Sequence, residues 1–499
     1  MPTRVDKTLD NYTLIRLIDS KKLSPSASLD YIMQSEILRR LKNNPKSSKT
    51  KDNKSCEYHN SKESASESAV ASALLAPCDT DIMSSKLSYY NTMANLSPFA
   101  FALLSILSSS SEENILISPY SIASALAMVL AGVTLESPSQ YQLTTLLNIG
   151  SHDDIPQLTQ SILTSSQGDK AGVTLSTANG IWTQGIIEPD YVSTVQDIHS
   201  ATAQPLPATY DPLNDFVANA TNNLIPTVFE PGQVVDPLTV AVLINAIHFK
   251  GKWRIPFEEA DTVDGMFTTV AGDTRQCNFM QLTRPMHVES RIEELGNATV
   301  LQLDYGSVGE SSSSAERKGK AQRINSHLRE VEGDPEFTAL FLLPPDNTPE
   351  SMTTMITNLT TFLSYESTRS VKDLMPPFKE RVHLSLPRFK ITYGTTSLKS
   401  PLESMGLKAP FESSVSDPQF LALSKDPKVY LSDILHKATM EVNEEGTEAA
   451  AVTVGVVMTR SIPLPPMEVK LDRPFLMIVL HVASGTPLFI GKMDDPEFT

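Results

Sequence analysis

Apolar residues recur along most of the chain at the spacings typical of helices and strands. Residues 87–107 have helical apolar spacing and end in a polar run, which predicts an amphipathic helix. Ser118 and Pro119 predict the start of a second helix, because Ser caps helix N-termini and Pro is favoured at the first helical position. Short apolar runs predict strands at 115–117, 175–182, 238–249, 299–303, 338–343, 382–391, 469–471, 475–482 and 488–490.

The order of these elements indicates the fold class. Helical stretches separate the strands in the first half, whereas strands dominate the second half, and no internal repeat is present. This order predicts an α+β domain with large antiparallel sheets.

Two segments depart from this pattern. Residues 1–85 are rich in Ser and Lys, and we expect them to form a low-complexity, disordered N-terminal extension that precedes one domain over 86–499. Residues 307–336 interrupt two strand-like runs, which predicts a disordered insertion, a site for an anionic polysaccharide, or a retained intron. The polysaccharide would bind the basic cluster Arg317, Lys318, Lys320 and Arg323.

Composition narrows the range of partners. The 499 residues carry 58 acidic and 41 basic side chains, a net charge of −17, which argues against nucleic acid as the main partner. Three cysteines and no Cys/His ligand spacing predict neither a disulfide framework nor a metal site. No apolar stretch is long enough to span a membrane. The polar N-terminus lacks a secretory signal, which favours a cytoplasmic product, although glycosylation sequons such as that at Asn219 would suit a secreted one.

The common enzyme motifs are missing from the sequence. We find no GxSxG, GxxxxGK[ST], HExxH or helix-opening GxGxxG pattern. The histidines in strand-like runs, including His436, are more typical of buried structural histidines than of general bases. We therefore expect no enzyme activity, no cofactor and no metal.

The segment 444–461 carries the most information about function. It alternates small residues with a second set that includes Glu448 and Val452, so as a strand it would have one small, uncharged side. Arg460 is the one basic residue between Gly446 and Met467, and a Pro-rich stretch follows Ser461. A loop presenting a single Arg suits a trypsin-like protease, whose specificity pocket pairs with a cation.

Four stretches resemble the serpin family, the serine protease inhibitors of the suicide-substrate type. Residues 445–451 are similar to the hinge of the family's reactive loop, and 469–496 to its C-terminal signature. Residues 245–253 and 114–126 resemble two further family segments, in the expected order. The resemblance implies three β-sheets, about eight or nine helices and an exposed reactive loop, over about residues 86–499. Phe216 stands where many members have Trp, an exchange that we expect to be tolerated.

The resemblance also implies roles for individual residues. The family places the cleaved bond fifteen residues along from the hinge glycine, which here gives Arg460–Ser461. Trp253 would pack where the loop first inserts. A polar cluster governing the opening of the sheet would comprise Ser118, Ser121, Asn245 and His436. The hinge would comprise Glu445, Gly446, Thr447, Glu448, Ala449, Ala450 and Ala451.

The function implied is suicide inhibition of trypsin-like serine proteases by a monomer that forms a covalent complex with its target. A non-inhibitory carrier or chaperone with the same fold is the alternative, although such proteins often have bulky or charged hinges. Family resemblance favours the extracellular space, against the cytoplasmic product that the missing signal favours.

Overall fold

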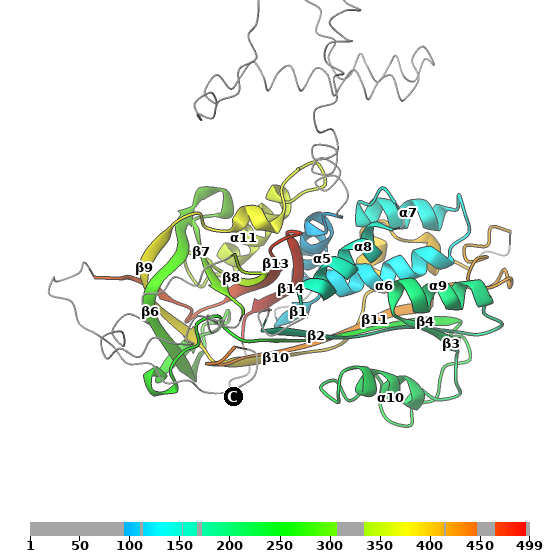
Figure 1. The fold of residues 1–499 in the computed structure, drawn as a ribbon, viewed down its shortest axis with the longest axis horizontal. Helices are drawn as coiled ribbons and strands as arrows, with labels where there is room; N and C mark the ends of the chain where they lie inside the picture. The colour runs from blue at the N-terminus through cyan, green and yellow to red at the C-terminus, as the bar shows by residue number, and fades with distance from the viewer. Residues whose placement is uncertain are drawn as a thin grey trace, which may run out of the picture. The chain divides into compact units, whose positions relative to one another are not determined.

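The computed structural model describes residues 94–109, 113–151, 153–166, 172–306, 334–413, 416–446 and 465–495. Helices gather in the first half of this part of the chain and strands in the second, which confirms the α+β class (Figure 1). No helix among the described residues is long and apolar enough to cross a membrane. The α-helices of the described part are α5 (Ser97–Ser109), α6 (Pro119–Gly132), α7 (Pro138–Leu147), α8 (Asp154–Ser165), α9 (Pro189–His199), α10 (Asp211–Ala220), α11 (Pro349–Phe362) and α12 (Lys399–Ser404).

One sheet has five strands in the order β10–β11–β4–β2–β3. Its two central strands, β11 and β4, run parallel, and each pairs antiparallel with its other neighbour, β10 or β2. We call the boundary between β4 and β11 the seam; the other parallel pair of this sheet, β2 and β3, lies at its edge. The strands are β2 (Val173–Thr183), β3 (Thr202–Pro205), β4 (Ala241–Gly251), β10 (Phe389–Ser397) and β11 (Asp433–Val442).

The other strands form two sheets that share β6. The last part of β6 pairs with β7, whereas its first part pairs with β5 and β9. The complete order is β1–β14–β13–β8–β7–β6–β9–β12, with β5 beside β6, so the expected three sheets are present. The strands are β1 (Ile115–Ile117), β5 (Val263–Thr268), β6 (Thr274–Ile292), β7 (Ala298–Asp304), β8 (Phe337–Leu343), β9 (Lys379–Pro387), β12 (Met467–Lys470), β13 (Phe475–His481) and β14 (Thr486–Met493).

Helices cover both faces of the five-stranded sheet. Helices α6 to α9 lie on one side of its long strands and α10 lies on the other (Figure 1). Nearly every residue of α6 is buried, because this helix contacts both the sheet and the surrounding helices. On the opposite face, Phe216 of α10 meets Trp182 of β2 edge-on, with ring centroids 5.1 Å apart. An aromatic contact therefore holds α10 against the sheet with Phe at this position.

The structure confirms most of the predicted elements and corrects two. Ser118 caps α6 by accepting a hydrogen bond from the Ser121 N–H, as predicted. The predicted strand 382–391 is wrong as one strand, because β9 ends at Pro387 and β10 begins at Phe389 in another sheet. Pro lacks the N–H that would continue the ladder. The helix predicted over 87–107 begins only at Ser97, while residues 87–93 lie outside the described part.

Candidate loop-insertion site

A tight turn joins the end of β11 to the candidate reactive loop. The Asn443 N–H donates to the Gly446 carbonyl over 2.9 Å, and the Gly446 N–H donates back over 3.2 Å. Gly446 also pairs antiparallel with Lys252, the residue that follows β4. The chain has therefore already reversed direction at Gly446, between the ends of the two strands that form the seam.

Only glycine fits at position 446. Its φ is +133°, a conformation that residues with a side chain rarely adopt. A Cβ atom here would lie 2.1 Å from the Gly251 carbonyl oxygen, far inside van der Waals contact. The turn thus depends on the absence of a side chain at Gly446, the glycine of the predicted hinge.

A buried carboxylate anchors the turn to the neighbouring strands. Glu444 is 3% exposed, and its carboxylate accepts hydrogen bonds from the Arg388 guanidinium and from Thr262 Oγ1, the latter over 2.8 Å. The Phe257 N–H donates to the Glu444 carbonyl over 2.8 Å. Burial alone would raise the pKa of the Glu444 carboxyl, but the hydrogen bonds from Arg388 and Thr262 outweigh burial and hold that pKa below its usual value.

Trp253 lies beside the turn and bonds to it twice. Its backbone N–H donates to the Glu445 carbonyl over 2.8 Å, and its indole Nε1–H donates to the Asn443 carbonyl over 3.0 Å. The indole stacks on Tyr305 with ring centroids 4.6 Å apart and is 3% exposed. Trp253 therefore combines a packing contact with direct support of the turn's backbone.

The four residues of the predicted polar cluster meet beneath the middle of the seam. Asn245 of β4 and His436 of β11 are directly opposite in the register. His436 Nδ1 and Asn245 Oδ1 are 2.7 Å apart, while the Ser118 N–H donates to His436 Nε2 over 3.2 Å. The Asn245 amide in turn donates to Ser121 Oγ and the Ser121 carbonyl. This network ties both seam strands to the start of α6.

The hydrogen bonds of His436 define its protonation. Because Nε2 accepts from a backbone N–H, the proton lies on Nδ1 and is donated to Asn245. Burial of the imidazole, which is fully enclosed, lowers its pKa to about 3, with only a small opposing effect from Asn245. A neutral imidazole thus bridges β11, β4 and α6 at physiological pH.

The structure adds residues that the sequence analysis missed. Asn179 of β2 accepts from the Asn245 amide over 2.6 Å, which extends the polar cluster to a third strand. Asn443, Glu444, Thr262 and Arg388 support the turn. Asn179 lies in a predicted strand and could have been found as a polar residue in an apolar run, whereas Arg388 lies 56 residues before Glu444 and no local pattern links them.

Several predicted site residues lie outside the described part of the chain. Within that part, no cluster of His, Cys, Asp and Glu could hold a metal ion. The undescribed site residues are Thr447, Glu448, Ala449, Ala450, Ala451, Arg460 and Ser461 of the loop and Arg317, Lys318, Lys320 and Arg323 of the insertion.

Comparison with known proteins identifies a matching family model and similar proteins. A family model described as "Serpin (serine protease inhibitor)" matches residues 94–496. Leukocyte elastase inhibitor A of Mus musculus is 32% identical over 413 residues, which cover 80% of this chain and 97% of the mouse protein. Serpin-Z2A of Oryza sativa is 29% identical and covers 78% of this chain and 92% of its own length.

Solved structures share the fold. Native AtSerpin1 of Arabidopsis superposes with a TM-score of 0.64 at 24% identity and covers 82% of this chain and 98% of its own. Human thyroxine-binding globulin, solved as a complex with thyroxine, has a TM-score of 0.64 at 23% identity and covers 82% of this chain and 99% of its own. The family match over residues 94–496 and the 32% identity with mouse leukocyte elastase inhibitor A show that the chain belongs to the serpin family.

Proposed function

We propose that this protein inhibits trypsin-like serine proteases as a suicide substrate, with cleavage after Arg460 and insertion of the freed loop into the seam between β4 and β11. The observation that carries the proposal is the position of Gly446. It pairs antiparallel with both Asn443 and Lys252, so the backbone at the start of the loop already points along the seam.

The register of the seam supports insertion with the small residues facing the core. Asn443 and Lys252 continue the parallel register that pairs His436 with Asn245. We take the loop to continue from Gly446 between β4 and β11, antiparallel to both strands. Thr447 then comes opposite Gly251 and Val442, and Thr453 comes opposite Asn245 and His436. Opposite residues share a face, so Thr447 and Thr453 point inward with His436, as do Ala449, Ala451, Gly455 and Val457.

The length of the loop also suits the seam. Residues 447–457 would pair with the whole of β4, from Gly251 back to Ala241. Arg460 would then pass just beyond the far end of β4, so a protease attached to it would be carried the length of the sheet. At about 3.4 Å per residue, the eleven inserted residues span about 37 Å.

The chemistry would belong to the protease. Its serine Oγ attacks the Arg460 carbonyl carbon, the Arg460–Ser461 amide bond breaks, and Ser461 leaves as a free amine. Residues up to Arg460 remain bound to the protease as an ester. Insertion then satisfies the backbone groups of the freed segment and buries its small side chains, which supplies the driving force. Inhibition requires insertion to precede hydrolysis of the ester.

A protease panel tests this function. The intact protein is mixed at increasing ratios with trypsin, chymotrypsin and elastase, and residual activity is titrated. We expect irreversible loss of trypsin activity at a ratio near one to one, and much weaker effects on the other two, whose pockets do not pair with a cation. Cleavage of the loop by trypsin without loss of trypsin activity would favour the alternative, a carrier or chaperone.

A further inference from the structure

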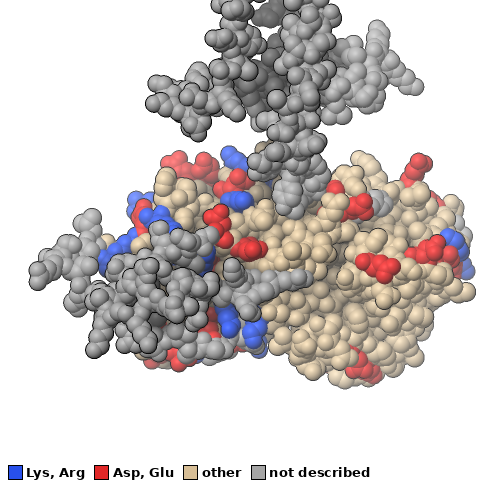
Figure 2. Space-filling model, viewed as in Figure 1, with Lys and Arg blue, Asp and Glu red and all other residues tan. Residues whose placement is uncertain are grey.

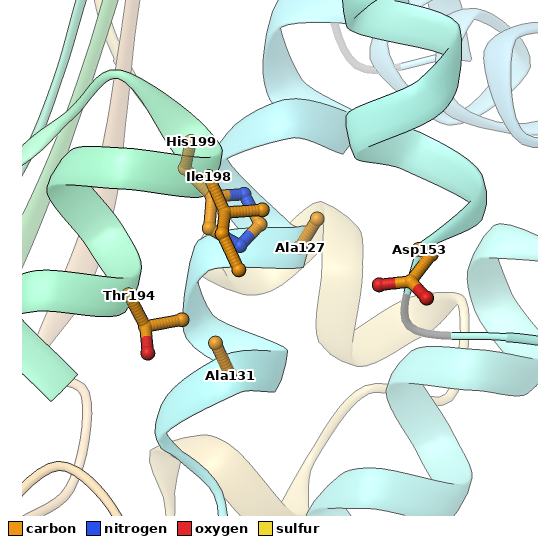
Figure 3. A pocket seen from close by; sticks show the side chains of 6 residues that line it. All are labelled: Ala127, Ala131, Asp153, Thr194, Ile198 and His199. Atoms are coloured by element: carbon orange, nitrogen blue, oxygen red, sulfur yellow. The ribbon is translucent and has the colours of Figure 1, made fainter. Parts of the chain in front are cut away.

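A cavity of about 180 Å³ opens between helices α6, α8 and α9 (Figure 3). None of the residues that line it belongs to the turn or to the polar cluster described above. Its walls are Ala127, Ala131, Asp153, Thr194, Ile198 and His199.

Small side chains on α6 create the space. Ala127 and Ala131 are four residues apart and therefore lie one above the other on the same side of the helix. Their methyl groups form an apolar floor, while Ile198, which is 49% exposed, stands at the rim (Figure 3). The cavity combines an apolar surface with access to solvent.

Two polar side chains face this space without a partner of their own. Asp153 is exposed and immediately precedes α8, but its carboxylate makes no capping hydrogen bond; Asp154 accepts instead from the N–H groups of Gly150 and Ser151. Burial lowers the pKa of His199 to about 4, so its imidazole is neutral at physiological pH. Among the described residues, neither the Asp153 carboxylate nor the His199 ring has a hydrogen bond or ion pair, and Figure 3 shows them on opposite sides of the cavity.

The charged residues around the cavity favour a positively charged ligand. Residues 87–249, which include α5 to α10, contain one Lys and no Arg against thirteen Asp and Glu. On the face seen in Figure 2, Lys and Arg gather mainly over the end that carries β6 and β9, whereas the half with α6 to α9 is mainly uncharged and its few charged side chains are mostly acidic. This field raises the local concentration of cations and opposes anions.

We propose that the cavity binds a small organic cation, an amine whose apolar body is about the size of one aromatic ring. The ammonium group would pair with Asp153 and the ring would lie on Ala127 and Ala131, next to the His199 imidazole. A cavity of about 150 Å³ suffices for benzene, so the volume fits a ring with a short arm.

Phenethylamine is a suitable probe, with phenethyl alcohol and phenylacetate as neutral and anionic controls of similar size. Binding to the full chain is measured by isothermal titration calorimetry at pH 7. We expect saturable binding of phenethylamine at one site per chain. Binding of phenethyl alcohol should be about three- to fivefold weaker, because the ion pair with the exposed Asp153 carboxylate is lost, and phenylacetate should not bind.

Variants locate the site. Asp153→Asn should weaken phenethylamine binding about three- to fivefold, and Ala131→Met should abolish it by filling the cavity. Asp197→Asn removes the same charge from an exposed position of α9 that does not line the cavity, and should leave binding unchanged. Equal binding of the amine and the alcohol, or unchanged binding in Asp153→Asn, would overturn the proposal. Asp153→Asn alters no packing, so it decides the question even if Ala131→Met does not fold.

Discussion

Removing the Arg388 side chain should destabilise the intact fold through the carboxylate that it leaves behind. The Glu444 side chain is 4% exposed and that of Arg388 is 28% exposed. In Arg388→Ala the carboxylate keeps Thr262 as its side-chain donor, while burial continues to oppose its charge. Arg388→Ala should therefore lower the unfolding free energy by more than the loss of an ordinary surface ion pair does.

The exposed fractions of the Glu444 and Arg388 side chains set the expected loss of unfolding free energy. Removing one partner of a fully buried pair costs about 3–5 kcal/mol, and losing a hydrogen bond to a charged group costs about 1.5–3 kcal/mol. Because Arg388 is partly exposed, water can enter the space that it leaves, and we expect a loss of about 2 kcal/mol for Arg388→Ala. Glu444→Gln should cost about 1 kcal/mol. The double variant should cost at least about 1 kcal/mol less than the sum, since no unpaired carboxylate remains.

Urea unfolding followed by tryptophan fluorescence measures these values. The chain has two tryptophans, and Trp253 bonds directly to the turn. Arg275→Ala is the matched control, because the Arg275–Asp495 pair is exposed (52% and 43%), and it should cost less than about 1 kcal/mol. A loss for Arg388→Ala no larger than that for Arg275→Ala, or strict additivity in the double variant, would refute the reasoning.

Three further predictions concern the turn, the polar cluster and the loop. Gly446→Ala should lower the unfolding free energy by about 2 kcal/mol or more, because the new Cβ meets the Gly251 carbonyl at a positive φ, whereas Gly394→Ala, which has open space around it, should be nearly neutral in urea unfolding. Since burial lowers the pKa of His436 to about 3, below the ordinary 6.5, the unfolded chain binds the proton first, and stability should fall as the pH drops from about 6.5 towards 3. His436→Gln should reduce this fall relative to the wild type and to the variant His383→Gln, which changes a half-buried histidine of β9. Identical pH profiles of urea unfolding for these proteins would contradict the assignment. Thr447→Arg should abolish covalent complex formation with trypsin on denaturing gels while cleavage after Arg460 persists, and Glu448→Arg, on the outward side, should still form complex; an unchanged yield of covalent complex in Thr447→Arg would show that the inward orientation proposed for Thr447 is wrong.

Local patterns predicted much of the fold. Ser118 and Pro119 gave the start of α6, and the apolar runs gave most strands within three residues at either end. The bounds of β11 were not predicted, although His436 was placed in a strand-like run, because Lys437 and Glu441 interrupt its apolar residues. Buried and half-buried residues alternate strictly along this strand. The break at Arg388 was also missed, since the assignment of consecutive strands to different sheets depends on tertiary pairing.

In the candidate site, too, some residues could be predicted from the sequence, whereas their contacts could not. Family resemblance predicted Ser118, Ser121, Asn245 and His436, and the structure brings all four together. Their contacts depend on the β4–β11 register, which no local pattern contains. The anchor formed by Glu444 and Arg388 joins the turn after β11 to the break between β9 and β10, 56 residues earlier, so only the structure shows it. The inward and outward orientations proposed for residues 447–457 were argued from both the alternation in the sequence and the position of Gly446.

The mass of the product formed with trypsin tests the central claim most directly. Trypsin and the intact protein are mixed at equal concentration, denatured and analysed by mass spectrometry. Suicide inhibition predicts a species with the mass of trypsin plus this chain without residues 461–499, joined as an ester at Arg460, together with the free 461–499 fragment. Two cleaved fragments with free, active trypsin and no joined species would contradict the account.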